Sequence, residues 1–97
     1  MTKYIELMNW TDQGIRNVKD SPSRLDAAKA TAKKFGCEIE QFFMTIGPYD
    51  GVVVVEAPDD DAVAKYTLSL GAGGNVRTTT LKAFSEASFR KIIGSLS

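Results

Sequence analysis

Apolar residues along the chain gather in runs that predict four strands. Tyr4–Trp10, Ile39–Ile46 and Val52–Pro58 are dense apolar segments of strand length, and Gly47–Gly51 between the last two predicts a hairpin. Val76–Phe84, rich in threonine, predicts the fourth strand. The third strand contains four consecutive valines. Because these cannot alternate between core and solvent, we expect both of its faces to be covered.

Between and after these strands, apolar residues at three- and four-residue steps predict three helices. The first has Ser21 as N-cap before Pro22 and ends at Gly36. The second begins at Asp59–Asp61, where carboxylates suit the positive end of the helix dipole. Ser85 caps the third helix. Its apolar stripe consists of Phe89, Ile92, Ile93 and Leu96.

The element order β-α-β-β-α-β, followed by a helix, predicts an α+β fold of the ferredoxin-like type. We expect a single domain over residues 1–97, with a four-stranded antiparallel sheet in which strands one and three are central. Two helices would cover one face of this sheet. One further helix is too narrow for the other face, so a homodimer with the two sheets packed face to face is predicted.

Composition removes several classes of function. Twelve basic and twelve acidic residues cancel, which argues against nucleic-acid and membrane partners. The sequence has no histidine, so a Ser-His-Asp triad and a proximal histidine for haem are impossible, and we expect no metal or other cofactor. A lone cysteine, Cys37, is expected to be a buried thiol in a reducing compartment. With no signal peptide evident in Met1–Trp10, a cytoplasmic location is the expectation.

Topology brings three connections to one end of the predicted sheet: the polar segment Thr11–Asp20, the hairpin turn Gly47–Gly51, and Gly71–Asn75. Polar groups that converge beside an apolar cavity are typical of a small-molecule site. Turn chemistry explains several of the same residues, because Asp and Asn often bond nearby backbone. The candidate ligand-binding residues are Trp10, Asp12, Tyr49, Asp50, Asn75 and Arg77.

The open sheet face is a second candidate site. We expect it to carry one parity of the first strand together with residues of strands two and four: Tyr4, Glu6, Met8, Trp10, Gln41, Phe43, Thr45, Thr78 and Thr80. Burying Glu6 unpaired would be costly. A structural ion pair with Arg77 or Lys82, or a position that faces solvent, is one interpretation, and a base with raised pKa is the alternative.

Several segments together resemble the GYD domain family, and they follow one another in order over nearly the whole chain. They are Thr11–Gly14, Ser21–Leu25, Gly47–Asp50, Val55–Asp60, Gly74–Thr78 and Lys82–Ser85. The family signature reads Gly-Pro-Tyr-Asp here. The resemblance implies a dimeric α+β barrel. The wider structural relatives include cofactor-free monooxygenases, haem enzymes and ligand-sensing regulators, and this range transfers no activity.

Three functions fit these observations. The leading hypothesis is a homodimer that binds a small molecule. The second is a cofactor-free enzyme of the oxygenase or isomerase type, with Trp10, Tyr49 and Asp50 or Glu6 as its reacting groups. The third is a structural assembly protein that uses the C-terminal apolar stripe, although such stripes usually cover a local core.

Overall fold

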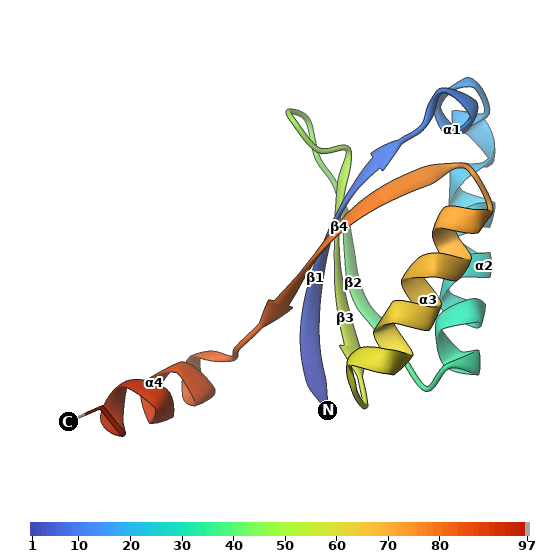
Figure 1. The fold of residues 1–97 in the computed structure, drawn as a ribbon. Coiled ribbons are helices and arrows are strands. Elements are labelled where there is room, and N and C mark those ends of the chain that lie inside the picture. Colours follow the sequence, from blue (N-terminus) through green and yellow to red (C-terminus); the bar gives the residue numbers. More distant parts are fainter. Residues whose placement is uncertain (97) are drawn as a thin grey trace.

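A four-stranded antiparallel sheet forms the centre of the computed structural model, which describes residues 1–96 (Figure 1). Ser97, the last residue of the predicted domain, lies outside the described residues. The strand order β2-β3-β1-β4 puts strands one and three in the centre, as predicted. The strands are β1 (Thr2–Trp10), β2 (Glu38–Met44), β3 (Gly51–Ala57) and β4 (Val76–Ala83).

Helices α2 (Ser21–Lys34) and α3 (Asp60–Ala72) lie on the same side of the sheet (Figure 1). The predicted ferredoxin-like fold is therefore confirmed. The connection after β1, predicted as a polar segment, contains two short helical elements. They are α1 (Asp12–Arg16), whose N-cap Thr11 accepts a hydrogen bond from the Gly14 backbone N–H at 3.0 Å, and the 3₁₀ turn η1 (Val18–Asp20).

Helix ends follow the predicted signals in two of three cases. The Asp59 side chain caps α3 by accepting from the Ala62 N–H at 2.9 Å, and Ser85 caps α4 (Glu86–Gly94) by accepting from the Ser88 N–H at 3.1 Å. The prediction of Ser21 as an N-cap was wrong. Ser21 is the first residue of α2 because η1 runs directly into the helix and puts Asp20 at the N-cap position.

The core lies between the sheet and the two helices. Val55 of β3, Ala32 of α2 and Tyr66 of α3 are almost completely buried there. The valines of β3 alternate: Val53 and Val55 face the helices, whereas Val52 and Val54 on the opposite face stay partly exposed. Within the chain, therefore, only one of the two faces of β3 is covered.

Helix α4 stands apart from the rest of the chain at the end of the extended β4 strand (Figure 1). Its apolar stripe is open to solvent within the chain, with Phe89 56%, Ile93 50% and Leu96 69% exposed. The stripe therefore does not cover the sheet of its own chain. Within residues 1–96, no helix has the length and apolar character that crossing a membrane requires.

Candidate functional site

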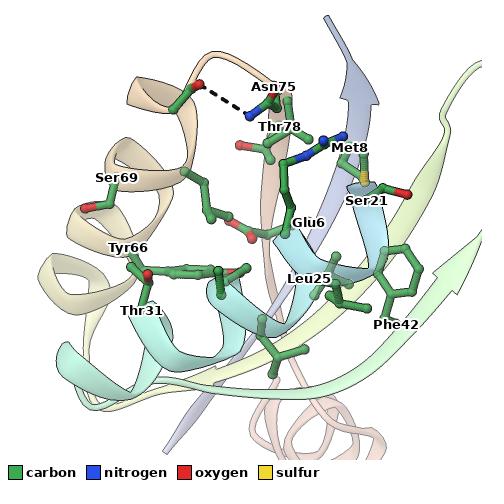
Figure 2. A pocket seen from close by; sticks show the side chains of 18 of the residues that line it. Glu6, Met8, Ser21, Leu25, Thr31, Phe42, Tyr66, Ser69, Asn75 and Thr78 are labelled. Carbon is green, nitrogen blue, oxygen red and sulfur yellow. Dashed lines mark hydrogen bonds between the residues drawn. The ribbon is translucent and has the colours of Figure 1, made fainter. Parts of the chain in front are cut away.

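A cavity of about 380 Å³ lies between the inner face of the sheet and helices α2 and α3 (Figure 2). Most of its wall is apolar, and β1, α2 and α3 supply the largest part. Its most prominent apolar side chains are Met8, Trp10, Leu25, Phe42, Val53 and Leu70. Such a concave apolar space with a few polar groups is typical of a small-molecule site.

Small residues on the two helices leave this space open. Ala28 and Thr31 on α2, together with Ser69 on α3 and Gly73 directly after it, line the cavity where larger side chains would fill the gap. The same alanines favour helix, so α2 forms without a wide apolar face. The cavity therefore exists because the side chains at these positions are small.

Glu6 is the charged group at the floor of the cavity, and its side chain has 0% exposure (Figure 2). Its Oε2 atom accepts hydrogen bonds from the Thr67 hydroxyl at 2.6 Å and the Thr80 hydroxyl at 3.1 Å. Its Oε1 atom is fully buried and has no partner within residues 1–96. One oxygen is thus fixed by α3 and β4, and the other remains available.

Burial raises the pKa of Glu6 above its ordinary value, and the two threonine hydroxyls oppose that shift. Burial, followed by the nearby negative charge of Glu6, also raises the pKa values of Tyr66 and Cys37. These shifts describe a poorly solvated environment. There Oε1 can accept a hydrogen bond when Glu6 is ionised, and it can donate one when the carboxyl is protonated.

Arg24 of α2 supplies a positive charge to the same cavity wall. Its guanidinium donates to the backbone carbonyls of Asn17 at 2.9 Å and Gly14 at 3.3 Å. Within residues 1–96, no carboxylate oxygen lies within 4.0 Å of an Arg24 nitrogen. Since a guanidinium has five N–H donors, Arg24 keeps donors free for a further acceptor.

The structure separates the six predicted ligand-binding residues into two groups. Trp10 and Asn75 line the cavity. Asp12 is exposed at the start of α1, and Arg77 is exposed opposite Asn9 on the far face of the sheet. Tyr49 and Asp50 lie in the β2–β3 hairpin and do not line the cavity.

Two of the three predicted connections meet directly at the upper end of the sheet. The Thr11 N–H donates to the Asn75 carbonyl at 3.1 Å, and the Gln13 amide donates to Asn75 Oδ1 at 3.1 Å. Gly14 approaches so closely that an added Cβ would lie 2.0 Å from the Asn75 carbonyl oxygen.

The hairpin is tied to β1 instead. Asp50 Oδ2 accepts from the Trp10 backbone N–H at 2.9 Å, and the Asp50 N–H donates to the Met8 carbonyl at 2.8 Å. These contacts give Asp50 a structural role, in agreement with the turn interpretation.

The expectation for the open face was wrong for β1 and β4 and right for Phe43 of β2. Tyr4, Glu6 and Met8 are buried toward the helices, and Trp10 and Thr78 line the cavity, whereas Phe43 pairs with Val52 on the open face. A register irregularity between Ile39 and Gln41 changes which β2 side chains share a face with these β1 residues. Apolar residues of β1 occur on both parities, so the sequence pattern could not decide which set faces the helices.

Neither predicted ion-pair partner of Glu6 contacts it. Lys82 pairs with Asp60 at 3.2 Å, and Arg77 lies on the opposite sheet face. The actual partners, Thr67 and Thr80, come from elements distant in sequence. Sequence reasoning missed Arg24 and Thr67. The available signal was polar residues on the inner faces of helices that otherwise pack against a sheet.

Comparisons with known proteins agree with the fold. The family model described as GYD domain matches residues 4–93. A protein of Thermus thermophilus named glutamine synthetase and cystathionine beta-lyase binding protein is 36% identical over 84 residues, which cover 86% of this chain and 88% of that protein.

Two solved structures share the fold. The crystal structure of MtbAldR has a TM-score of 0.69 at 12% identity, over 88% of this chain and 54% of that one. The present chain thus spans about half the length of that protein. TTHA0845 from Thermus thermophilus has a TM-score of 0.55 at 22% identity, over 88% of this chain and 95% of that one.

Proposed function

This chain belongs to the GYD domain family, and we propose that it is a homodimeric protein that binds a small organic molecule between its sheet and helices α2 and α3. The observation that carries this proposal is the completely buried carboxylate of Glu6, which lines a mostly apolar cavity and whose Oε1 atom has no hydrogen-bond partner within residues 1–96. A buried polar atom without a partner costs roughly 1–3 kcal/mol. A ligand that supplies the partner recovers part of this cost.

Trp10 makes the proposal directly testable, because it is the sole tryptophan of the sequence and lines the cavity. A titration of the protein with medium-chain alcohols and acids should shift its fluorescence emission in a saturable manner. Thermal unfolding should move to higher temperature in parallel, since a ligand that binds the folded state alone stabilises it.

A pair of variants on α2 gives the control. Ala28→Leu extends a side chain into the cavity and should abolish saturation, whereas Ala30→Leu, at an exposed position of the same helix, should leave it unchanged. Circular dichroism confirms that both variants are folded. If Ala28→Leu and the parent protein respond identically, the ligand site is elsewhere and the proposal fails.

The dimer part of the proposal is supported by the sheet face that lies opposite the helices. Cross-strand neighbours there share one face, whose centre is apolar. Phe43 is 53% exposed and Leu81 47% exposed. The apolar side chains of this open face are Ile5, Leu7, Phe43, Val52, Val54 and Leu81. Packing two such faces together would remove them from water.

A second candidate function, binding to metabolic enzymes, rests on the 36% identical relative named for glutamine synthetase and cystathionine beta-lyase binding. The separate helix α4 offers an exposed apolar stripe for such a contact. Surface-bound protein should retain purified glutamine synthetase or cystathionine beta-lyase, and Ile92→Asp should weaken this binding. Retention of neither enzyme by the folded parent protein would exclude this candidate.

A further inference from the structure

We infer that the ligand of this cavity is an elongated carboxylic acid with a hydrogen-bond donor, an amine or a hydroxyl, at its far end. This inference rests on the proposed small-molecule function and specifies the class of ligand. Glu6 would receive the donor end, Arg24 the carboxylate, and the apolar wall the chain between them. Each part follows from a separate observation.

The inner end of the cavity is defined by Glu6. Thr67 and Thr80 both occupy Oε2, so the carboxylate cannot turn to satisfy Oε1 without breaking one of these bonds. Oε1 is therefore the acceptor that a ligand would meet, and no group of residues 1–96 bonds to it. A hydrogen bond from an amine or hydroxyl to a buried carboxylate contributes roughly 1.5–3 kcal/mol.

The outer end of the cavity is defined by Arg24. The carbonyls that hold its guanidinium belong to Gly14 and Asn17, which follow the end of β1 at Trp10. The half-buried Arg24 has no carboxylate partner within residues 1–96. A guanidinium in such a position binds carboxylates through paired, charge-assisted hydrogen bonds.

The chain puts the two ends at different levels along the sheet. Glu6 lies four residues before Trp10 on β1, so the backbone of these two residues is roughly 13 Å apart at a rise of about 3.3 Å per residue, and Gly14 and Asn17, whose carbonyls hold Arg24, follow Trp10 in the sequence. Val53 lies beside Glu6 in the sheet, Met8 lies between Glu6 and Trp10 on β1, and Leu25 of α2 lines the same cavity. A compact ligand could contact one end only, whereas an extended chain of several methylene groups could reach both.

Isothermal titration calorimetry with matched probes tests the inference. The two-ended probes are eight-carbon ω-amino and ω-hydroxy acids, and the one-ended controls are octanoate, octylamine and octanol. We expect at least one two-ended acid to bind about tenfold or more tightly than every control, because each polar end adds a charge-assisted hydrogen bond. Comparing the amine and the hydroxyl identifies the donor.

Variants assign the two ends. Glu6→Gln should make the two-ended acid bind no more tightly than octanoate. Arg24→Met should make it bind no more tightly than octylamine or octanol. Glu40→Gln and Arg16→Met, which change a carboxylate and an arginine outside the cavity wall, should preserve the tighter binding of the two-ended acid.

The possible failures are distinguishable. If octanoate or octanol binds as tightly as the two-ended acids, the cavity binds small molecules and only the inferred ligand class is wrong. If none of the probes binds to the folded parent protein, the ligand class and the proposed function both fail. This comparison uses the parent protein alone, so it holds even if a variant does not fold.

Discussion

Thr67 of α3 and Glu6 of β1 are joined by a hydrogen bond of 2.6 Å that links the helix layer to the centre of the sheet. The bond fixes the Oε2 atom, and the buried Oε1 atom has no hydrogen-bond partner within residues 1–96. This contact thus connects the stability of the domain to the chemistry of its candidate site.

Replacing Thr67 with valine should lower the free energy of unfolding by roughly 1–3 kcal/mol, because a buried carboxylate oxygen loses a donor. Thr80→Val should cost less, since its bond to the same oxygen is longer, at 3.1 Å. Urea unfolding followed by circular dichroism measures both. Thr79→Val, on the opposite face of β4, is the control. Equal losses in all three variants would contradict the assigned role of Thr67.

The raised pKa of Glu6 predicts a pH-dependent stability. Between its ordinary value of 4.5 and the raised value, the folded state holds a proton that the unfolded state releases. This contribution to stability is complete below pH 4.5 and is lost as the pH rises through the pKa of the folded state. The free energy of unfolding of the parent protein should therefore fall relative to that of Glu6→Gln as the pH increases.

Urea unfolding of both proteins between about pH 4 and pH 8 tests this expectation, because this range begins near the ordinary pKa of a carboxyl group and extends above it. The other titratable groups near Glu6 do not alter this comparison of the parent protein with Glu6→Gln. The pKa values of Tyr66 and Cys37 are raised from already high values. The lowered pKa of Asp60 has the opposite effect and is common to both proteins. If the free energies of unfolding of the parent protein and Glu6→Gln differ by the same amount at every pH in this range, the prediction is contradicted.

Gly14→Ala should be strongly destabilising, by roughly 3 kcal/mol or more, because its new Cβ would lie 2.0 Å from the Asn75 carbonyl oxygen. Gly71→Ala is the matched control, since nothing lies within 4 Å of its added Cβ and alanine favours the α3 helix. Thermal unfolding compares the two. Similar midpoints would show that the contact between α1 and the Gly73–Asn75 segment is not close.

Asp50→Ala separates stability from ligand binding. It removes the acceptor of the Trp10 N–H and should cost roughly 1–2 kcal/mol of stability. Because Asp50 does not line the cavity, ligand affinity measured by calorimetry should stay within about twofold. If a folded Asp50→Ala variant lost much of its ligand affinity, Asp50 would contribute to the binding site, as predicted from the sequence.

Leu7→Lys tests the proposed dimer. A charge at the centre of the open face should prevent two sheets from packing, because burying it unpaired is costly. Sedimentation analysis should give twice the chain mass of 10.6 kDa for the parent protein and the single chain mass for the variant. Leu68→Lys, at a 74% exposed position of α3, should sediment like the parent protein. A monomeric parent protein would overturn the proposal.

The sequence by itself determined the element order, the central position of strands one and three, and most helix ends. These features depend on local rules. The apolar runs that form the strands and the caps at Asp59 and Ser85 act over a few residues, so their effect can be read without knowing the rest of the structure. Two of the predicted site residues, Trp10 and Asn75, also lie at the cavity.

Only the tertiary structure decided which face of β1 the helices cover. Both parities of that strand are apolar, and a register irregularity in β2 changed the set of facing side chains. The cavity depends on contacts between residues far apart in sequence: Thr67 is 61 residues from Glu6, and Thr80 is 74 residues from it. Such pairings arise from packing helices onto a sheet. The sequence therefore indicated that Glu6 needed a partner, and the fold determined which of its oxygens remained free.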